Sequence, residues 1–262
     1  MALRHATGWG LLECKRALRE TDGDTEEAKE ILGVVRLMHD DRINRSPAEG
    51  RICSARDGEG SKVAIVGVST QTSFAANNAQ FADMVAKVAA DALLQDAGEV
   101  EEPDAMQAAI DEVRLAMKED ICLVRGTVVG SGGRVGIYVR FNGKAGAVVE
   151  LAGDGVTDEL LADLCMHVTG VTLPPIAISV EDVPVDVIER EGRIAKAQAI
   201  AQGKAEEVAE KMVAGKIRRF YERNVLLEQA FVKDDRRTVQ DVLPSGVTIK
   251  SFVRMQVGGS VE

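Results

Sequence analysis

No stretch of this 262-residue chain approaches the ~20 consecutive apolar residues that a helix needs to cross a bilayer. The first residues also lack a basic region followed by an apolar stretch, so we expect no secretory signal. The four cysteines are far apart and form no C-x-x-C pair, and the three histidines are equally dispersed. Because a zinc site needs closer ligand spacing, neither a metal nor another cofactor is expected. Dispersed single cysteines are typical of reduced, mostly buried thiols in a cytoplasmic protein.

Patterns that would support catalysis or nucleotide binding are also lacking. No Ser/His/Asp or Cys/His arrangement for nucleophilic catalysis emerges from the sequence. The only glycine-rich run, residues 129–136 (V-G-S-G-G-R-V-G), lies between two expected strands. A phosphate-binding loop would instead end in Gly-Lys-Ser/Thr and open a helix. We interpret the run as a flexible hairpin loop and expect no nucleotide binding by this chain.

Acidic residues outnumber basic ones. The 42 acidic and 32 basic residues give a formal net charge of −10, which argues against a nucleic-acid surface. Basic and aromatic residues do occur together in residues 216–231, but neighbouring glutamates cancel most of the positive field. We interpret that segment as a solvated helix. The composition therefore favours a protein partner over a nucleotide, a nucleic acid or a membrane.

The chain begins with two short helical patterns. Apolar residues recur at helical spacing over residues 11–18, and a second pattern runs over residues 25–35 after a D-G-D turn. Two helices of this length cannot bury a core by themselves. We therefore predict a small helical module over residues 1–38, followed by a polar linker over residues 39–50.

Short strands and amphipathic helices follow the linker. Two strands bracket the turn signal D-G-E-G at residues 57–60 and predict a β-hairpin. Residues 81–94 predict an amphipathic helix, and residues 99–119 predict a second, more acidic one. The first helix should bury Phe81, Met84, Val85, Val88 and Leu93. We group these elements into a first α+β half, residues 51–121.

The same order of elements recurs in a second half, which comprises residues 122–183 and 225–262. Strands are predicted at 122–129, 135–141 and 145–151, and Asn142-Gly143 forms the tight turn between the last two. A helix is predicted over residues 158–169.

The last strand of this half is predicted over residues 248–257, where apolar and polar residues alternate. The alternation predicts that one face is apolar, formed by Ile249, Val253, Met255 and Val257.

A helical segment, residues 184–224, interrupts the second half and is broken by Gln202-Gly203-Lys204. Two antiparallel helices joined by a short turn fit this pattern. Their apolar residues suffice for one seam, so the hairpin projects from the core and is a candidate for self-association. The predicted fold class is α+β, with a helical module, two hairpin-plus-helix halves and an inserted helical hairpin.

Three segments resemble the elongation factor Ts family, the guanine-nucleotide exchange factors of elongation factor Tu. They are residues 7–18 (T-G-W-G-L-L-E-C-K-R-A-L), residues 71–75 (Q-T-S-F-A) and residues 210–234, so the likeness spans most of the chain. The resemblance implies a UBA-like N-terminal module whose first helix is shortened here. It also implies binding to Tu·GDP and promotion of GDP release, without covalent chemistry.

Residues 71–75 have two interpretations. From the residues alone, Phe74 is a core aromatic while Thr72 and Ser73 cap a helix. The family has Thr-Asp-Phe-Val at this place, in a loop that wedges into the nucleotide domain of Tu and disturbs its magnesium site. Thr72 and Phe74 match that motif, whereas Ser73 replaces the acidic residue and Ala75 the valine. The resemblance implies that the wedge keeps its aromatic tip and loses its charge.

The resemblance also implies further contacts with Tu. His167, taken alone, is a partly buried structural histidine in an amphipathic helix. It matches the histidine of the family's Met-His-Val, which contacts the nucleotide domain of Tu. Near the start of the chain, four residues match or lie beside family contact positions: Arg4, Leu11, Leu12 and Lys15.

The sequence leaves two other functions open. The chain could be a Tu-binding scaffold subunit of a larger assembly, such as a viral RNA polymerase complex, with weak exchange activity. The shortened first helix and Ser73 favour this alternative. An enzyme with a cleft between the two halves is a third possibility, but no residues support it.

Overall fold

The computed structural model describes residues 49–201 and 205–258, together with Leu18, Arg19, Thr21, Gly23, Asp24, Thr25 and Ala28. Most of the predicted N-terminal module lies outside these residues. Within it, the backbone N–H of Gly23 donates to the carbonyl of Leu18 at 2.8 Å, and Gly23 has a φ of +95°. A positive φ favours glycine, which accounts for Gly23 in the D-G-D turn.

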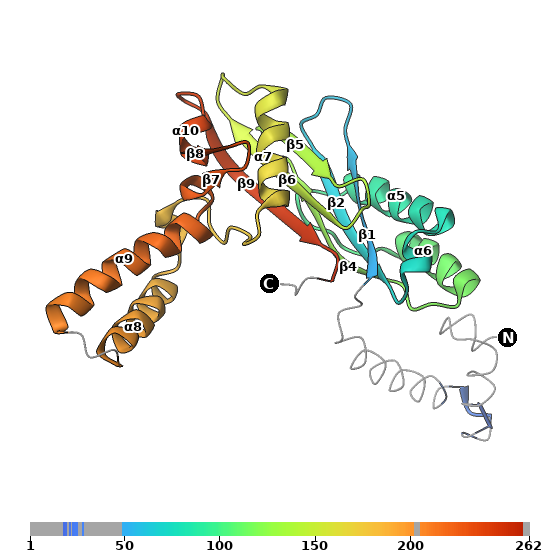
Figure 1. Cartoon of the computed structure of the whole chain (residues 1–262). Coiled ribbons are helices and arrows are strands. Elements are labelled where there is room, and N and C mark those ends of the chain that lie inside the picture. Colours follow the sequence, from blue (N-terminus) through green and yellow to red (C-terminus); the bar gives the residue numbers. More distant parts are fainter. Residues whose placement is uncertain are drawn as a thin grey trace.

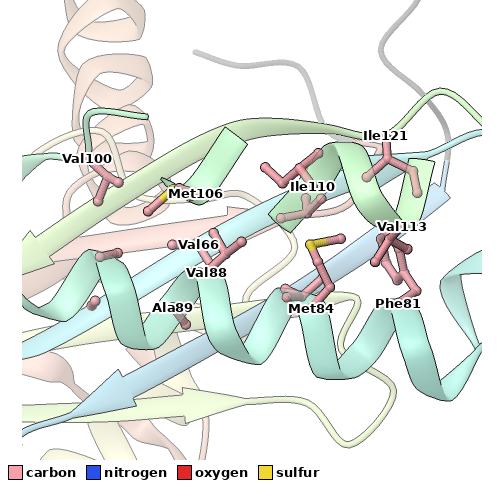
Figure 2. Close-up of a cluster of buried hydrophobic side chains, with 14 of the residues drawn as sticks. Val66, Phe81, Met84, Val88, Ala89, Val100, Met106, Ile110, Val113 and Ile121 are labelled. Atoms are coloured by element: carbon pink, nitrogen blue, oxygen red, sulfur yellow. The ribbon is translucent and has the colours of Figure 1, made fainter. Parts of the chain in front are cut away.

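The first sheet has four antiparallel strands in the order β1-β2-β4-β3. They are β1 (Glu49–Arg56), β2 (Val63–Thr70), β3 (Gly98–Glu99) and β4 (Cys122–Val129). Two helices, α5 (Ala79–Leu93) and α6 (Asp104–Met117), cover one face (Figure 1). The core beneath them includes Val66, Phe81, Val88, Met106 and Ile110 (Figure 2).

The second sheet has three antiparallel strands in the order β5-β6-β9. These are β5 (Arg134–Val139), β6 (Ala145–Ala152) and β9 (Thr248–Gln256). Helix α7 (Asp158–Gly170) packs on one face (Figure 1). A further apolar cluster joins the inner faces of both sheets, with Ile65 of β2 and Val148 of β6 among its members. The core is therefore built as helices, sheet, sheet and helix.

Strand β4 belongs to the first sheet, although we predicted it as part of the second half. It pairs antiparallel with β2, from Val63 opposite Val129 to Ser69 opposite Cys122. Its alternation supplies side chains to two clusters, because Val128 packs beneath α5 and α6 while Val129 faces the second sheet. The strand is present as predicted, but it pairs in the first sheet rather than with the strands that follow it in the second half.

The apolar face predicted for β9 is divided by a β-bulge. Leu151 pairs with Ile249 and Glu150 pairs with Ser251, so Lys250 is an extra residue in the ladder. One extra residue reverses the alternation of side chains. Ile249 accordingly packs beneath α7, whereas Val253 and Met255 pack between the sheets. The prediction that Ile249 shares a face with Val253 and Met255 was wrong.

Other predicted elements are present with shifted ends. Helix α6 begins at Asp104, because Gly98 and Glu99 pair with β4 and Pro103 is the N-cap residue. The Asn142-Gly143 turn is confirmed: Gly143 has a φ of +64° and donates its N–H to the carbonyl of Arg140. The predicted core residues of α5 are buried, except that Leu93 is half-buried.

The inserted segment forms two antiparallel helices, α8 (Val185–Ala201) and α9 (Glu206–Asn224), that project away from the sheets (Figure 1). Hydrogen bonds hold the base of this hairpin. The N–H of Ile176 donates to the carbonyl of Asn224 at 2.8 Å, and the N–H of Leu226 donates to the carbonyl of Ala177 at 2.9 Å.

Among the described residues, no helix is both long and apolar enough to cross a membrane.

Short elements complete the chain. They are α4 (Ser73–Ala76), the 3-10 helices η1 (Val180–Asp182) and η2 (Leu226–Glu228), the strand pair β7 (Ala230–Phe231) and β8 (Asp234–Thr238), and α10 (Val239–Val242).

Candidate partner-binding site

The segment after β2 presents an aromatic side chain to solvent. Helix α4 is a single turn, and its N-cap Thr72 accepts a hydrogen bond from the N–H of Ala75 at 3.2 Å. Ala75 and Ala76 are buried, so they anchor the turn, whereas the side chain of Phe74 is 82% exposed. The interpretation of Phe74 as a core aromatic was wrong, and the capping role of Thr72 is confirmed.

The backbone that follows Phe74 in the chain is also held in place. The side-chain amide of Asn77 donates to the carbonyl of Ser73 at 2.8 Å. Asn78 then caps α5, since its side-chain oxygen accepts from the N–H of Gln80 at 2.8 Å. Two caps in succession leave little freedom for the residues between them. Phe74 is therefore an exposed aromatic on a constrained turn.

Glu119 binds the residues that precede Phe74 in the same turn. The hydroxyl of Thr70 donates to its Oε2 at 2.6 Å, and the backbone N–H of Thr72 donates to Oε2 at 3.2 Å. The hydroxyl of Thr72 donates to Oε1. The neighbouring Asp120 accepts from the side-chain amide of Gln71 at 2.6 Å. No local pattern predicts these contacts, because the partners lie 47 to 49 residues apart.

The surroundings of Glu119 favour its ionised form. Partial burial raises the pKa of this carboxyl, but the hydrogen bonds from Thr70, Thr72 and the nearby backbone outweigh it and hold the pKa below its ordinary value. An ionised carboxylate is an acceptor only, which matches the donors that surround it.

His167 lies in α7 with no exposed surface. Its Nδ1 accepts the N–H of Val232 at 3.2 Å, so its Nε2 carries the proton and donates to Oε1 of Gln229 at 3.1 Å. The ring stacks on Phe231, with centroids 5.8 Å apart. Burial lowers the pKa of His167, which keeps the ring neutral. The histidine is fully buried rather than partly buried, and the free chain does not offer it to a partner.

The exposed residue beside this histidine is Val232, whose side chain is 53% exposed. The turn that carries Val232 is pinned to α7 by an ion pair between Lys233 and Asp163 at 2.5 Å. His167 lies in α7, which packs on the second sheet, whereas Phe74 lies in α4, beside β1 and β2 of the first sheet. Arg4, Leu11, Leu12 and Lys15 lie outside the described residues. A contact role for each of these residues stays a prediction.

The glycine-rich loop after β4 is closed around a carboxylate. Glu150 is 2% exposed and accepts from the N–H groups of Ser131 at 2.8 Å and Gly133 at 3.0 Å. These are the amide groups that a phosphate would require, and they already face a negative charge. Within the described part of the chain, no group of His, Cys, Asp or Glu residues is arranged to hold a metal ion.

Comparison with known proteins places this arrangement in a family. The family model described as "Elongation factor TS" matches residues 71–259, which begin at the turn that carries Phe74 and include the helical hairpin. The chain belongs to the elongation factor Ts family.

Relatives named elongation factor Ts resemble nearly the whole chain. The protein of Methylococcus capsulatus is 38% identical over 99% of this chain and 91% of its own length. Those of Hydrogenovibrio crunogenus and Teredinibacter turnerae are 37% and 36% identical over 99% of this chain, and over 90% and 89% of their own lengths. The chain is therefore a translation elongation factor of the Ts type, a nucleotide exchange factor rather than a catalyst of covalent chemistry. The interpretation as a scaffold subunit receives no support.

Proposed function

We propose that this chain binds elongation factor Tu in its GDP form and promotes GDP release by pressing residues 72–75 against the magnesium and nucleotide site. The observation that carries the proposal is the exposure of Phe74 on a turn that lies between two N-caps, Thr72 of α4 and Asn78 of α5. Aromatic residues, Phe included, are enriched in the buried cores of protein interfaces relative to the rest of the surface. A turn that is already ordered loses little further entropy on binding, so more of the contact energy is available to distort the partner.

The energetics follow from linkage. A protein that binds Tu better when nucleotide is absent must weaken nucleotide binding by the same factor. An effect of about 10⁴-fold on nucleotide affinity requires differential binding of about 5.5 kcal/mol. Burial of one Phe side chain contributes roughly 1.5–3 kcal/mol, so Phe74 cannot supply the whole effect. Other contacts must share it.

The N-terminal module is the first proposed source of these other contacts. Its UBA-like helices would place Arg4, Leu11, Leu12 and Lys15 against the partner. A module too small to bury its own core gains from covering its apolar residues with a second protein.

The region around His167 is the second proposed source. Because the histidine is buried, we assign the direct contact to Val232, whose backbone the imidazole holds in place. This changes the expected role of His167 from a contact to a support for one.

Self-association through the helical hairpin is a separate proposal. The hairpin exposes Ile194, Ile200 and Val208, whose side chains are 45%, 56% and 45% exposed. Sedimentation of the full chain at increasing concentration tests it, with a chain that remains monomeric throughout as the contradicting result.

Nucleotide release tests the main proposal. Tu loaded with a fluorescent GDP analogue is mixed with excess unlabelled GDP, with and without the full chain, and the release rate is followed by fluorescence. We expect the chain to accelerate release strongly. Binding to Tu without any acceleration would contradict the proposal and restore the scaffold interpretation.

A further inference from the structure

We propose that Glu119 is the positioning residue for Phe74: its carboxylate fixes the turn that presents the aromatic ring to the partner. The inference rests on the proposed function of residues 72–75, in which Phe74 makes the contact and Glu119 does not. It deepens that function by naming the side chain that holds the contact residue in place.

The topology brings Glu119 to this position. Strands β2 and β4 are antiparallel neighbours, and their last pair joins Ser69 to Cys122. The residues just before β4 therefore lie beside the residues just after β2. Glu119 and Asp120 consequently face Thr70, Gln71 and Thr72 across the end of the sheet.

The backbone that carries Glu119 is itself held on both sides. On one side, Lys118 ends α6 in the left-handed conformation with a φ of +57°, and its N–H donates to the carbonyl of Arg114 at 2.9 Å. On the other side, Nε of Arg114 donates to the carbonyl of Ile121 at 3.0 Å, and Ile121 is buried. Arg114 thus spans the segment, and the Glu119 carboxylate extends from a fixed support.

The hydrogen bonds connect this support to α4. Thr72 makes two bonds to Glu119, one from its N–H and one from its hydroxyl. The same hydroxyl oxygen accepts from Ala75 and so caps the turn that bears Phe74. Without an acceptor at Glu119, the Thr72 side chain is free to rotate away from its capping position, and the buried hydroxyl of Thr70 loses its partner.

The test compares Glu119→Ala with Glu112→Ala, which removes an exposed glutamate from α6. Glu119→Gln is the second variant, because it keeps the side-chain volume and one acceptor oxygen. Each full-length variant is examined by its thermal melting, by hydrogen exchange of its backbone amides and by stimulated release of fluorescent GDP from Tu.

In the free protein, we expect Glu119→Ala to speed hydrogen exchange at the amides of Ala75 and Ala76, which bond to Thr72. Glu119→Gln should have a smaller effect and Glu112→Ala none. Unchanged exchange at these amides in both Glu119 variants would overturn the positioning role. This measurement needs no Tu, so it gives a result even if the proposed function fails.

In the release assay, we expect Glu119→Ala to slow stimulated release by roughly 2- to 10-fold, the range for ordering one side chain at an interface. The decisive variant is the double mutant with Phe74→Ala. If Glu119 acts through Phe74, the double mutant is no slower than Phe74→Ala alone. Fully additive losses would overturn the inference, whereas a Phe74→Ala protein with normal activity would contradict the proposed function itself.

Discussion

The backbone N–H of Val232 donates to Nδ1 of His167 at 3.2 Å, across 65 residues of sequence. This bond requires a neutral imidazole, because Nδ1 accepts only when it carries no proton, whereas the bond from Nε2 to Gln229 and the stacking on Phe231 fit either form of the ring. A second proton on the ring would remove the acceptor for Val232. The structure therefore makes the Phe231–Lys233 region sensitive to acid.

The first prediction concerns this sensitivity. Burial lowers the pKa of His167 below the value of about 6.5 that it has in the unfolded chain. The unfolded state then binds more protons, so the free energy of unfolding falls as the pH decreases from about 6.5 toward the folded-state pKa, by at most about 1.4 kcal/mol per pH unit. Above about pH 6.5 the contribution is fully present.

Urea unfolding of the native chain and of His167→Gln between pH 8 and pH 5 measures the effect. The variant should be less stable at pH 8, and its stability should depend less on pH between 6.5 and 5. Parallel pH profiles for the two proteins would show that His167 does not titrate as described.

The second prediction concerns Ser73, where the chain departs from the family motif. A carboxylate beside a magnesium site can repel or capture groups that hold the ion, whereas a hydroxyl only forms a weak hydrogen bond. The Ser73 side chain is exposed, so Ser73→Asp should not disturb α4. At an N-terminal turn the added charge is also favourable.

We expect Ser73→Asp to raise stimulated GDP release, most clearly at high magnesium, where displacing the ion is hardest. Affinity for nucleotide-free Tu should change little. A magnesium titration of the release rate measures this, and equal rates for both proteins across it would mean that charge at this position has no influence.

The third prediction concerns the N-terminal module. Within the part of the chain that the structure describes, the apolar clusters of the core draw their members from residues between Ile52 and Val257. Removing residues 1–38 should therefore leave the melting temperature of the remaining chain nearly unchanged, while affinity for Tu falls strongly. Calorimetric melting and titration against Tu measure both effects. Full affinity in the shortened chain would exclude the module as a binding element.

The sequence predicts those elements whose signals are local. The D-G-E-G turn signal between β1 and β2, helical periodicity in α7 and the Asn142-Gly143 turn each depend on a few consecutive residues, and the structure contains the hairpin, the helix and the turn. The αα-hairpin follows from two periodic runs around a glycine break.

Relationships between distant segments could not be predicted in this way. The pairing of β4 with β2 depends on which strand edge of the first sheet is unpaired when the chain comes back to it after α6. The bulge at Lys250 depends on the partner strand, β6. A single Phe in a turn has no periodic neighbours that indicate its side, so the exposure of Phe74 was open. The contacts of Glu119 join segments 47 to 49 residues apart.

The most direct test of the central claim compares Phe74→Ala with Leu94→Ala in stimulated GDP release. Leu94 is a matched control, since its side chain is 83% exposed at the far end of α5, against 82% for Phe74. We expect Phe74→Ala to slow release at least about tenfold, equivalent to about 1.4 kcal/mol, with unchanged melting, and Leu94→Ala to match the native chain. Equal activity of the two variants, both folded, would contradict the claim that Phe74 drives nucleotide release.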